Sequence, residues 1–211
     1  MGSTSAWGTR RTMMQMVMVA ITAFMLFINL PLQVQGAADV VDAEGNPVLV
    51  GGEYYVLPAV AGSGGGLTLK MRVNNSCPLY VAQENSEKSR GLPVVLRPAK
   101  GQRGNYSSVI VQEHVNLNVN MAAVTACVQS TAWSVQNDAN TTKRFIKASD
   151  SSSLFQIVKA IDGDGYVLYF CPCNCRLVCT KVGIYVDGDE KRWLVINNSG
   201  EALRVQFQKN E

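Results

Sequence analysis

The run from Val41 to Pro58 constrains the fold of this chain more than any other segment. Short apolar stretches alternate in it with two turns, one at Gly45-Asn46-Pro47 and one at Gly51-Gly52. Glycine and proline punctuate a chain at tight turns, and β-branched and aromatic residues between them are typical of strands. The run therefore predicts a strand, a turn, a second strand, a second turn and an aromatic strand.

The rest of the chain continues this pattern of short apolar segments separated by turn residues. Val115, Leu117, Val119 and Met121 alternate with Asn116, Asn118 and Asn120, so the pattern places them on opposite faces of one strand. No amphipathic helical stripe interrupts the series. The apolar segments expected to be strands are 54–57, 67–71, 79–82, 94–96, 109–111, 115–119, 123–128, 133–135, 145–146, 154–158, 167–170, 183–186, 193–196 and 203–207. About a dozen short strands predict an all-β sandwich or barrel-like fold.

Residues 1–36 are expected to be a secretory signal peptide. Arg10 and Arg11 precede an apolar run from Met13 to Leu32, and small residues follow it. Cleavage before Ala37 or before Asp39 would fit this arrangement, and a retained membrane anchor is the alternative. The remaining residues, 37–211, form one domain of 175 residues (211 minus 36), which is enough for a hydrophobic core.

Cysteines and glycosylation sequons agree with secretion. The chain has 6 cysteines, all after residue 36, and an even number of cysteines in a secreted chain indicates disulfides. Candidate N-glycosylation sites are Asn74, Asn105, Asn140 and Asn197. We therefore expect a glycoprotein in an extracellular or vacuolar location, with no membrane contact after the signal peptide is removed.

Composition excludes several classes of function. Without Arg10 and Arg11, 17 Lys and Arg (19 minus 2) balance 16 Asp and Glu, so no basic surface for nucleic acid is expected. The one histidine, His114, has no serine nucleophile motif to serve, so we expect no enzyme and no cofactor. Asp162-Gly163-Asp164-Gly165 lacks the other ligands of a calcium loop, and Asp187-Gly188-Asp189-Glu190 is better interpreted as a hairpin turn.

Taken together, several segments resemble the soybean-type Kunitz inhibitor family, which includes the miraculin-like proteins. The similar segments occur in the family's order and cover nearly all of residues 40–209; they are 41–58, 77–83, 91–96, 115–119, 127–135, 170–172, 183–187 and 205–209. The resemblance implies a β-trefoil of about twelve strands, a monomer, and a role in plant defence.

The resemblance also implies two disulfides, Cys77–Cys127 and Cys171–Cys179. A bridge that closes a loop of roughly 50 residues stabilises a fold by about 3–4 kcal/mol. Cys173 and Cys175 are separated by one residue, so they pair in a strained ring, stay free, or exchange partners with Cys171 and Cys179. Zinc binding by these four cysteines is the alternative, but they lack the usual pair-spacer-pair arrangement.

Family members block a serine endopeptidase by inserting an exposed loop in the manner of a substrate. Here the matching loop contains Pro98, Ala99, Lys100, Gly101, Gln102, Arg103 and Gly104. Pro98-Ala99-Lys100 resembles the Pro-x-Arg of trypsin-directed members, so Lys100 is the expected P1 residue, the side chain that fills the primary pocket. Arg103 is the second choice. Trypsin-like pockets carry a buried carboxylate, which selects a basic P1.

Two residues set this chain apart from trypsin-directed members. Those members carry an asparagine before the Gly-Gly pair that supports the loop, and the matching position here is Val50, which has no amide. A glycan on Asn105 would stand five residues from Lys100. The alternatives are therefore an inhibitor of α-amylase or another enzyme class, and a non-inhibitory storage, taste-modifying or binding protein on the same scaffold.

Overall fold

The structure is a computed structural model that describes residues 37–73, 76–100, 109–173, 179–197 and 200–211. The expected signal peptide, with its two cleavage sites, lies outside these residues. Twelve strands and no helix make up the described part. The strands are β1 (Glu53–Pro58), β2 (Leu67–Val73), β3 (Ser76–Gln83), β4 (Val94–Pro98), β5 (Leu117–Met121), β6 (Ala132–Asn137), β7 (Arg144–Ser149), β8 (Leu154–Lys159), β9 (Tyr166–Cys171), β10 (Thr180–Val186), β11 (Arg192–Ile196) and β12 (Arg204–Lys209). Within the described ranges no helix is long and apolar enough to span a bilayer.

Six of the strands close into an antiparallel barrel. The hydrogen-bonded order is β1, β4, β5, β8, β9 and β12, and β12 returns to pair with β1. Closure removes the open sheet edges that would otherwise be available for aggregation. The side chains of alternate residues fill the barrel, as the burial of Leu117, Val119 and Met121 on β5 shows.

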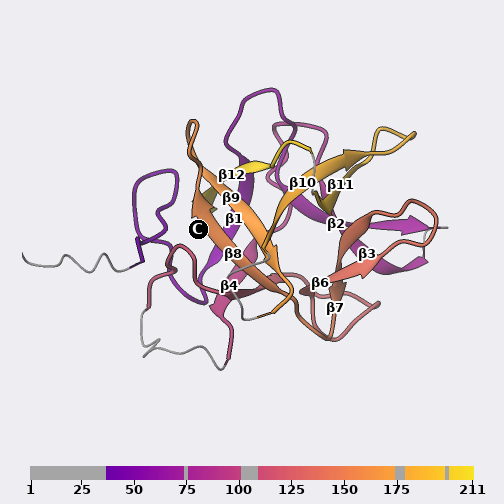
Figure 1. Cartoon of the computed structure of the whole chain (residues 1–211), viewed down its shortest axis with the longest axis horizontal. Helices are drawn as coiled ribbons and strands as arrows, with labels where there is room; N and C mark the ends of the chain where they lie inside the picture. The colour runs from indigo at the N-terminus through magenta and orange to yellow at the C-terminus, as the bar shows by residue number, and fades with distance from the viewer. Residues whose placement is uncertain (1–36, 74–75, 101–108, 174–178, 198–199) are drawn as a thin grey trace, which may run out of the picture. The chain divides into compact units, whose positions relative to one another are not determined.

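The other six strands form three hairpins, β2–β3, β6–β7 and β10–β11. The hairpins pair with one another through β3–β7, β3–β11 and β7–β11. In Figure 1 their strands lie together, to one side of the labelled barrel strands. Along the chain, a unit of one barrel strand, two hairpin strands and one barrel strand thus occurs three times. This arrangement is the β-trefoil that the family resemblance implies, with the expected number of strands.

Two apolar segments that were expected to be strands are not. Residues 109–111 contribute an isolated bridge, Leu49 to Ile110, and further backbone hydrogen bonds to residues 40, 48 and 50 of the opening segment, but no continuous ladder. Residues 123–128 belong to the connection between β5 and β6. Apolar alternation cannot distinguish a strand from a connection whose side chains also rest against the core.

The expected first and second strands of the opening run are also absent, and only its aromatic strand forms, as β1. Residues 41–50 form isolated bridges, Val41 to Pro47 and Leu49 to Ile110, around a turn in which Gly45 has φ of 86°. The backbone N–H groups of Glu44 and Asn46 both donate to the Asp42 carboxylate. This side chain satisfies donors that a regular ladder would have used.

The structure contains the two disulfides that the resemblance implies. Cys77 and Cys127 are bonded across 50 residues, and Cys171 and Cys179 across 8. Cys173 is also disulfide-bonded, and Cys175 lies outside the described residues. Because the sulfurs of Cys171 and Cys179 are bonded to each other, they are not the thiolates that a zinc site needs.

Candidate functional site: the connection between β4 and β5

The expected inhibitory loop leaves the barrel at the end of β4 and returns at β5. Pro98 pairs with Leu117, so the two strands hold the base of the loop together. Ala99 is buried, and its backbone N–H donates to the carbonyl of Asn116 at 2.9 Å. The next residue, Lys100, is exposed. The chain thus passes from a fixed, buried position to a solvent-exposed cation within one residue.

Gly101, Gln102, Arg103 and Gly104 lie outside the described residues. The second choice for P1, Arg103, therefore has no structural account. Asn105 and the sequon asparagine Asn74 lie outside them as well.

The returning limb of the loop, residues 109–111, is held by the opening segment of the chain, residues 39–51. Val50 donates its backbone N–H to the carbonyl of Val109, and Val111 donates to Val48, both at 2.8 Å. The N–H of Gly51 reaches the carbonyl of Leu96 on the outgoing strand at 2.9 Å. The opening segment therefore contacts both limbs of the loop. Val50 contributes through its backbone and packs its side chain against the barrel core.

A buried polar pair supports the same base from inside. The side-chain amide of Gln156, on β8, donates to Oδ1 of Asn116 at 2.7 Å. Asn116 is 6% exposed and Gln156 7% exposed, so water competes little for this hydrogen bond. Since the carbonyl of Asn116 accepts from Ala99, the pair connects the wall of the barrel to the residue before Lys100.

Sequence reasoning missed this pair. The alternation from Val115 to Met121 placed Asn116 with Asn118 and Asn120 on the outer face. The structure confirms that Val115, Leu117, Val119 and Met121 are buried, but Asn116 is buried too, because it precedes β5 and does not follow its pleat. No local signal distinguishes it from its two neighbours, since its partner is 40 residues away.

The turn that holds His114 also depends on a buried carboxylate. The N–H of Lys159 donates to Oε2 of Glu113 at 2.7 Å, and the N–H of His114 donates to the carbonyl of Ile157 at 3.1 Å. His114 is exposed and has φ of 60°, a turn conformation. It therefore lies in a turn shortly before β5.

The described sequon asparagines differ in their surroundings. Asn140 is exposed in the turn between β6 and β7. Asn197 follows β11 and uses its side chain within a turn, where Oδ1 accepts from the N–H of Gly200 at 2.8 Å. Both lie far along the chain from the loop base.

The acidic turn segments are hairpin connections. Residues 162–165 join β8 to β9, and Gly163 and Gly165 have the positive φ of a tight turn. Residues 187–190 join β10 to β11, where the N–H of Asp187 donates to the carbonyl of Lys191 at 3.0 Å. Within the described ranges, no cluster of three or more His, Cys, Asp or Glu side chains is placed to hold a metal ion.

Comparisons with known proteins agree with this geometry. Residues 40–209 match the Kunitz legume family model, described as trypsin and protease inhibitor. A Kunitz type trypsin inhibitor of Medicago truncatula is 33% identical over 181 residues, covering 81% of this chain and 87% of the relative. The α-amylase/subtilisin inhibitor of rice is 36% identical over 163 residues, covering 74% of this chain and 77% of the relative.

Solved structures show the same relationship. Soybean trypsin inhibitor in its complex with porcine pancreatic trypsin superposes with a TM-score of 0.69 at 27% identity, covering 82% of this chain and 99% of the inhibitor. Sequence and fold thus agree over the whole described domain. The chain belongs to the Kunitz legume family of trypsin and protease inhibitors, which are not enzymes.

Proposed function

We propose that this protein inhibits a trypsin-like serine endopeptidase, with Lys100 as the P1 residue of a substrate-like loop. The observation that carries the proposal is the position of Lys100. It is exposed directly after Ala99, which is buried and hydrogen-bonded to Asn116. A fixed backbone that presents a free basic side chain is the arrangement that an enzyme with a carboxylate in its primary pocket selects.

Inhibition would follow from how the loop is held. A loop that is already ordered loses little conformational entropy on binding, so more of the contact energy appears as affinity. After cleavage at Lys100, the two new chain ends would remain attached to a barrel that is intact on both sides. The opening segment would hold the returning limb, and the Asn116–Gln156 pair would hold the outgoing limb. The cleaved ends would then stay close enough for the bond to re-form.

The loop base has backbone support at position 50, although the side-chain amide of an asparagine is absent there. The backbone N–H of Val50 donates to Val109, and that of Gly51 donates to Leu96. Each such bond contributes about 0.5–1.5 kcal/mol. We therefore infer that these backbone hydrogen bonds hold the base of the loop without a side-chain amide at position 50.

The direct test is a titration of trypsin with the oxidised mature protein and with Lys100→Ala. For the unchanged protein we expect an endpoint at one inhibitor per trypsin. For the variant we expect the inhibition constant to rise about 100-fold, since a P1 side chain is a dominant contact. Arg103→Ala is the matched control and should inhibit normally. If Lys100→Ala inhibits fully and Arg103→Ala does not inhibit, Arg103 is the P1 residue. No inhibition by the unchanged protein would refute the trypsin assignment.

A second candidate function is inhibition of α-amylase. It rests on the rice relative, whose name includes both α-amylase and subtilisin. An amylase assay with the unchanged protein and with Lys100→Ala separates the two. Amylase inhibition that survives in Lys100→Ala would indicate a second surface, away from the loop.

We also propose that the protein is secreted after removal of residues 1–36. The disulfides support this, because such bonds persist in oxidising compartments. N-terminal sequencing of the protein recovered from the secretory pathway should begin at Ala37 or Asp39. A chain that retains the apolar run from Met13 to Leu32 would instead be membrane-anchored.

A further inference from the structure

Two of the sequon asparagines, Asn140 and Asn197, place the same side-chain nitrogen in very different surroundings. N-linked glycosylation attaches a bulky, hydrated sugar chain to Nδ2 of the asparagine and replaces one of its two N–H hydrogens. Both positions satisfy the pattern Asn-x-Ser/Thr, so the sequence does not distinguish them. The distinction has to come from the room and the hydrogen bonds around each nitrogen in the folded protein.

The turn between β6 and β7 holds the backbone of Asn140 and leaves its side chain without a hydrogen bond. Oδ1 of Asp138 accepts from the N–H groups of Asn140 and Thr141, both at 2.9 Å, and from Oγ1 of Thr141 at 3.0 Å. The N–H of Asp138 donates to the carbonyl of Lys143 at 2.9 Å and closes the turn. Asn140 is exposed, and within the described ranges its side chain has no hydrogen-bond partner. A sugar on Nδ2 would therefore break no contact.

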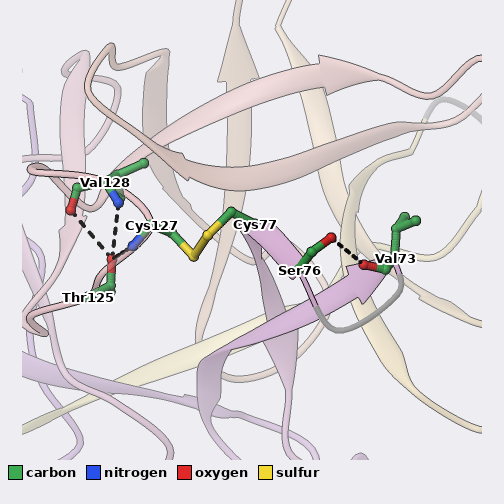
Figure 2. Close-up of a disulfide and its surroundings, with 6 residues drawn as sticks. All are labelled: Val73, Ser76, Cys77, Thr125, Cys127 and Val128. Atoms are coloured by element: carbon green, nitrogen blue, oxygen red, sulfur yellow. Dashed lines mark hydrogen bonds between the residues drawn. A yellow bond between two sulfur atoms is a disulfide. The ribbon is translucent and has the colours of Figure 1, made fainter.

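The turn is also anchored to the neighbouring hairpin. Arg72, on β2, pairs with Oδ2 of Asp138, the oxygen that the turn does not use. Strand β2 pairs with β3, where Cys77 is disulfide-bonded to Cys127, as Figure 2 shows. The backbone that presents Asn140 is thus fixed by contacts that do not involve its side chain.

The amide of Asn197 is used inside the connection between β11 and β12. Oδ1 of Asn197 accepts from the N–H of Gly200 at 2.8 Å, and Nδ2 donates to the carbonyl of Glu201 at 3.4 Å. A side-chain carbon added to Gly200 would lie 2.1 Å from Nδ2, and one added to Gly183, on β10, would lie 3.0 Å from it. Backbone therefore packs against this nitrogen from two elements, and a sugar there would force the connection apart.

We propose that the folded, secreted protein carries an N-linked oligosaccharide on Asn140 and none on Asn197. The inference rests on the proposed secretion, because the secretory pathway holds the lipid-linked sugar donor. In the transfer, Nδ2 of Asn140 bonds to C1 of the first N-acetylglucosamine, and the bond from C1 to the lipid pyrophosphate breaks. The amide proton passes to a base of the transferring enzyme, and the lipid pyrophosphate leaves as an anion.

Folding makes the selection, because the enzyme acts on the chain before it has folded. A chain with a sugar on Asn197 would have to form the connection to β12 without the packing around Nδ2. Strand β12 closes the barrel between β1 and β9, so this chain would fail at barrel closure. A chain with a sugar on Asn140 meets no such obstacle.

A glycan on Asn140 would stand away from the expected inhibitory loop. Pro98 pairs with Leu117 at the start of β5, where the base of the loop lies. Ala132, at the start of β6, pairs with Asn120 near the other end of β5, and the turn that holds Asn140 follows the far end of β6. Binding of a protease to the loop should therefore not depend on this glycan.

The test measures glycan occupancy site by site on the full chain, expressed in plant cells and recovered as the folded, disulfide-bonded protein. Digestion with trypsin and a glutamate-specific protease separates the sequons, because cleavage after Glu113 parts Asn105 from Asn140. Enzymatic release of the glycan in heavy-oxygen water converts each occupied asparagine to a labelled aspartate. We expect the label at Asn140 and not at Asn197. A labelled Asn197 would overturn the proposal.

Two variants give a second reading. Asn140→Gln should lower the mass of the protein by one glycan and leave the titration of trypsin unchanged. The matched control, Asn197→Asp, keeps Oδ1 as the acceptor for Gly200 and should leave the glycan mass unchanged. A loss of glycan mass in Asn197→Asp would contradict the proposed selection.

A second preparation separates this inference from the proposed secretion. In it, the signal peptide of a protein known to be secreted replaces residues 1–36. A glycan on Asn140 in this preparation, together with its absence from the native chain, would refute secretion of the native chain and support the site. An unmodified Asn140 in both preparations would overturn the site.

Discussion

Two fully buried tryptophans show how differently the two packed regions of this molecule are stabilised. Trp133, on the hairpin strand β6, lies in the main hydrophobic cluster, edge-to-face against Phe155 on β8 at 5.6 Å between ring centres, and its indole N–H has no partner among the described residues. Trp193 lies in a smaller cluster, which consists of Tyr80, Ala82, Phe145, Trp193 and Val195. Its ring packs beside that of Tyr80, and its indole N–H donates to Oδ2 of Asp187 at 2.7 Å. The first ring is held by packing, and the second by packing and a charged acceptor.

Cations lie against aromatic rings of both clusters, but only in the smaller cluster is such a cation paired with a carboxylate in the described residues. The guanidinium of Arg72 lies 3.8 Å from the ring centre of Phe145 and pairs with Asp138. The ammonium of Lys143 lies 4.8 Å from the ring centre of Tyr185. In the main cluster, the ammonium of Lys159 lies 4.8 Å from the ring centre of Tyr166. Because two hydrogen-bonded carboxylates, Asp138 and Asp187, lie beside the smaller cluster, we infer that acid pH affects the smaller cluster more than the main one.

The two regions also differ in their relation to the inhibitory loop. Phe155 of the barrel core pairs in register with Leu117, and the next residue, Gln156, bonds to Asn116 at the loop base. The smaller cluster draws on β3, β7, β10 and β11, and none of these strands borders the loop. Damage to the core should therefore reach the loop, and damage to the smaller cluster should not.

The largest expected effect comes from truncating one aromatic ring in each region. Phe155→Ala and Phe145→Ala should each lower the free energy of unfolding by about 3–5 kcal/mol, measured by urea denaturation, because both leave a cavity at a buried site. Only Phe155→Ala should also weaken the inhibition constant for trypsin, by roughly tenfold, through a less ordered loop. Equal weakening by Phe145→Ala would show that the two regions are coupled.

A smaller effect separates the two tryptophans. Trp193→Phe and Trp133→Phe remove the same atoms from fully buried sites, but only the first removes a hydrogen bond, the one from the indole to Oδ2 of Asp187. We expect Trp193→Phe to lower the free energy of unfolding by about 1–2 kcal/mol more than Trp133→Phe does. Equal losses would mean that the Asp187 hydrogen bond contributes nothing to stability.

The smallest effect is a dependence on acid pH. The hydrogen bond from Arg72 lowers the pKa of Asp138 to about 2, below its ordinary value of 3.8, helped by Thr141 and opposed by burial. Burial raises the pKa of Asp187, but hydrogen bonds from Trp193, Lys191 and Asp189 outweigh it and leave the pKa lowered. A lowered pKa means that the stabilisation is complete above about pH 4 and disappears as the pH falls towards 2.

Asp138→Asn tests this dependence. The variant should be less stable than the unchanged protein by about 1 kcal/mol at pH 6, and the difference should shrink between pH 4 and pH 2. Urea denaturation at a series of pH values gives both quantities. A difference that stays constant down to pH 2 would exclude the Arg72–Asp138 pair as the cause.

The strands and their faces could be predicted from the sequence because each depends on local alternation. Leu117, Val119 and Met121 show the pattern and are buried as expected. The β-trefoil itself could not be deduced from alternation, because the pairing of β5 with β8 or of β1 with β12 leaves no local signal. It came from the resemblance to a family.

The candidate site could be predicted only in part, because the contacts that support it also join residues far apart in the sequence. The loop and Lys100 came from the family resemblance, while the support under the loop did not. The Asn116–Gln156 bond joins residues 40 positions apart, and the Val50–Val109 bond joins residues 59 positions apart (109 minus 50). Contacts of this kind depend on the closed barrel, so they become visible only when the strands are placed.

The pairing of β1 with β12 has a consequence for biosynthesis. Tyr54 lies opposite Lys209, and the N–H of Ala43 donates to the carbonyl of Phe207, so the first and last parts of the domain complete each other. During synthesis, the barrel cannot close until β12 has left the ribosome. The nascent chain must therefore leave one edge of β1 and one edge of β9 unpaired until β12 is available, and a chain that terminates before β12 would leave the barrel open between these two strands.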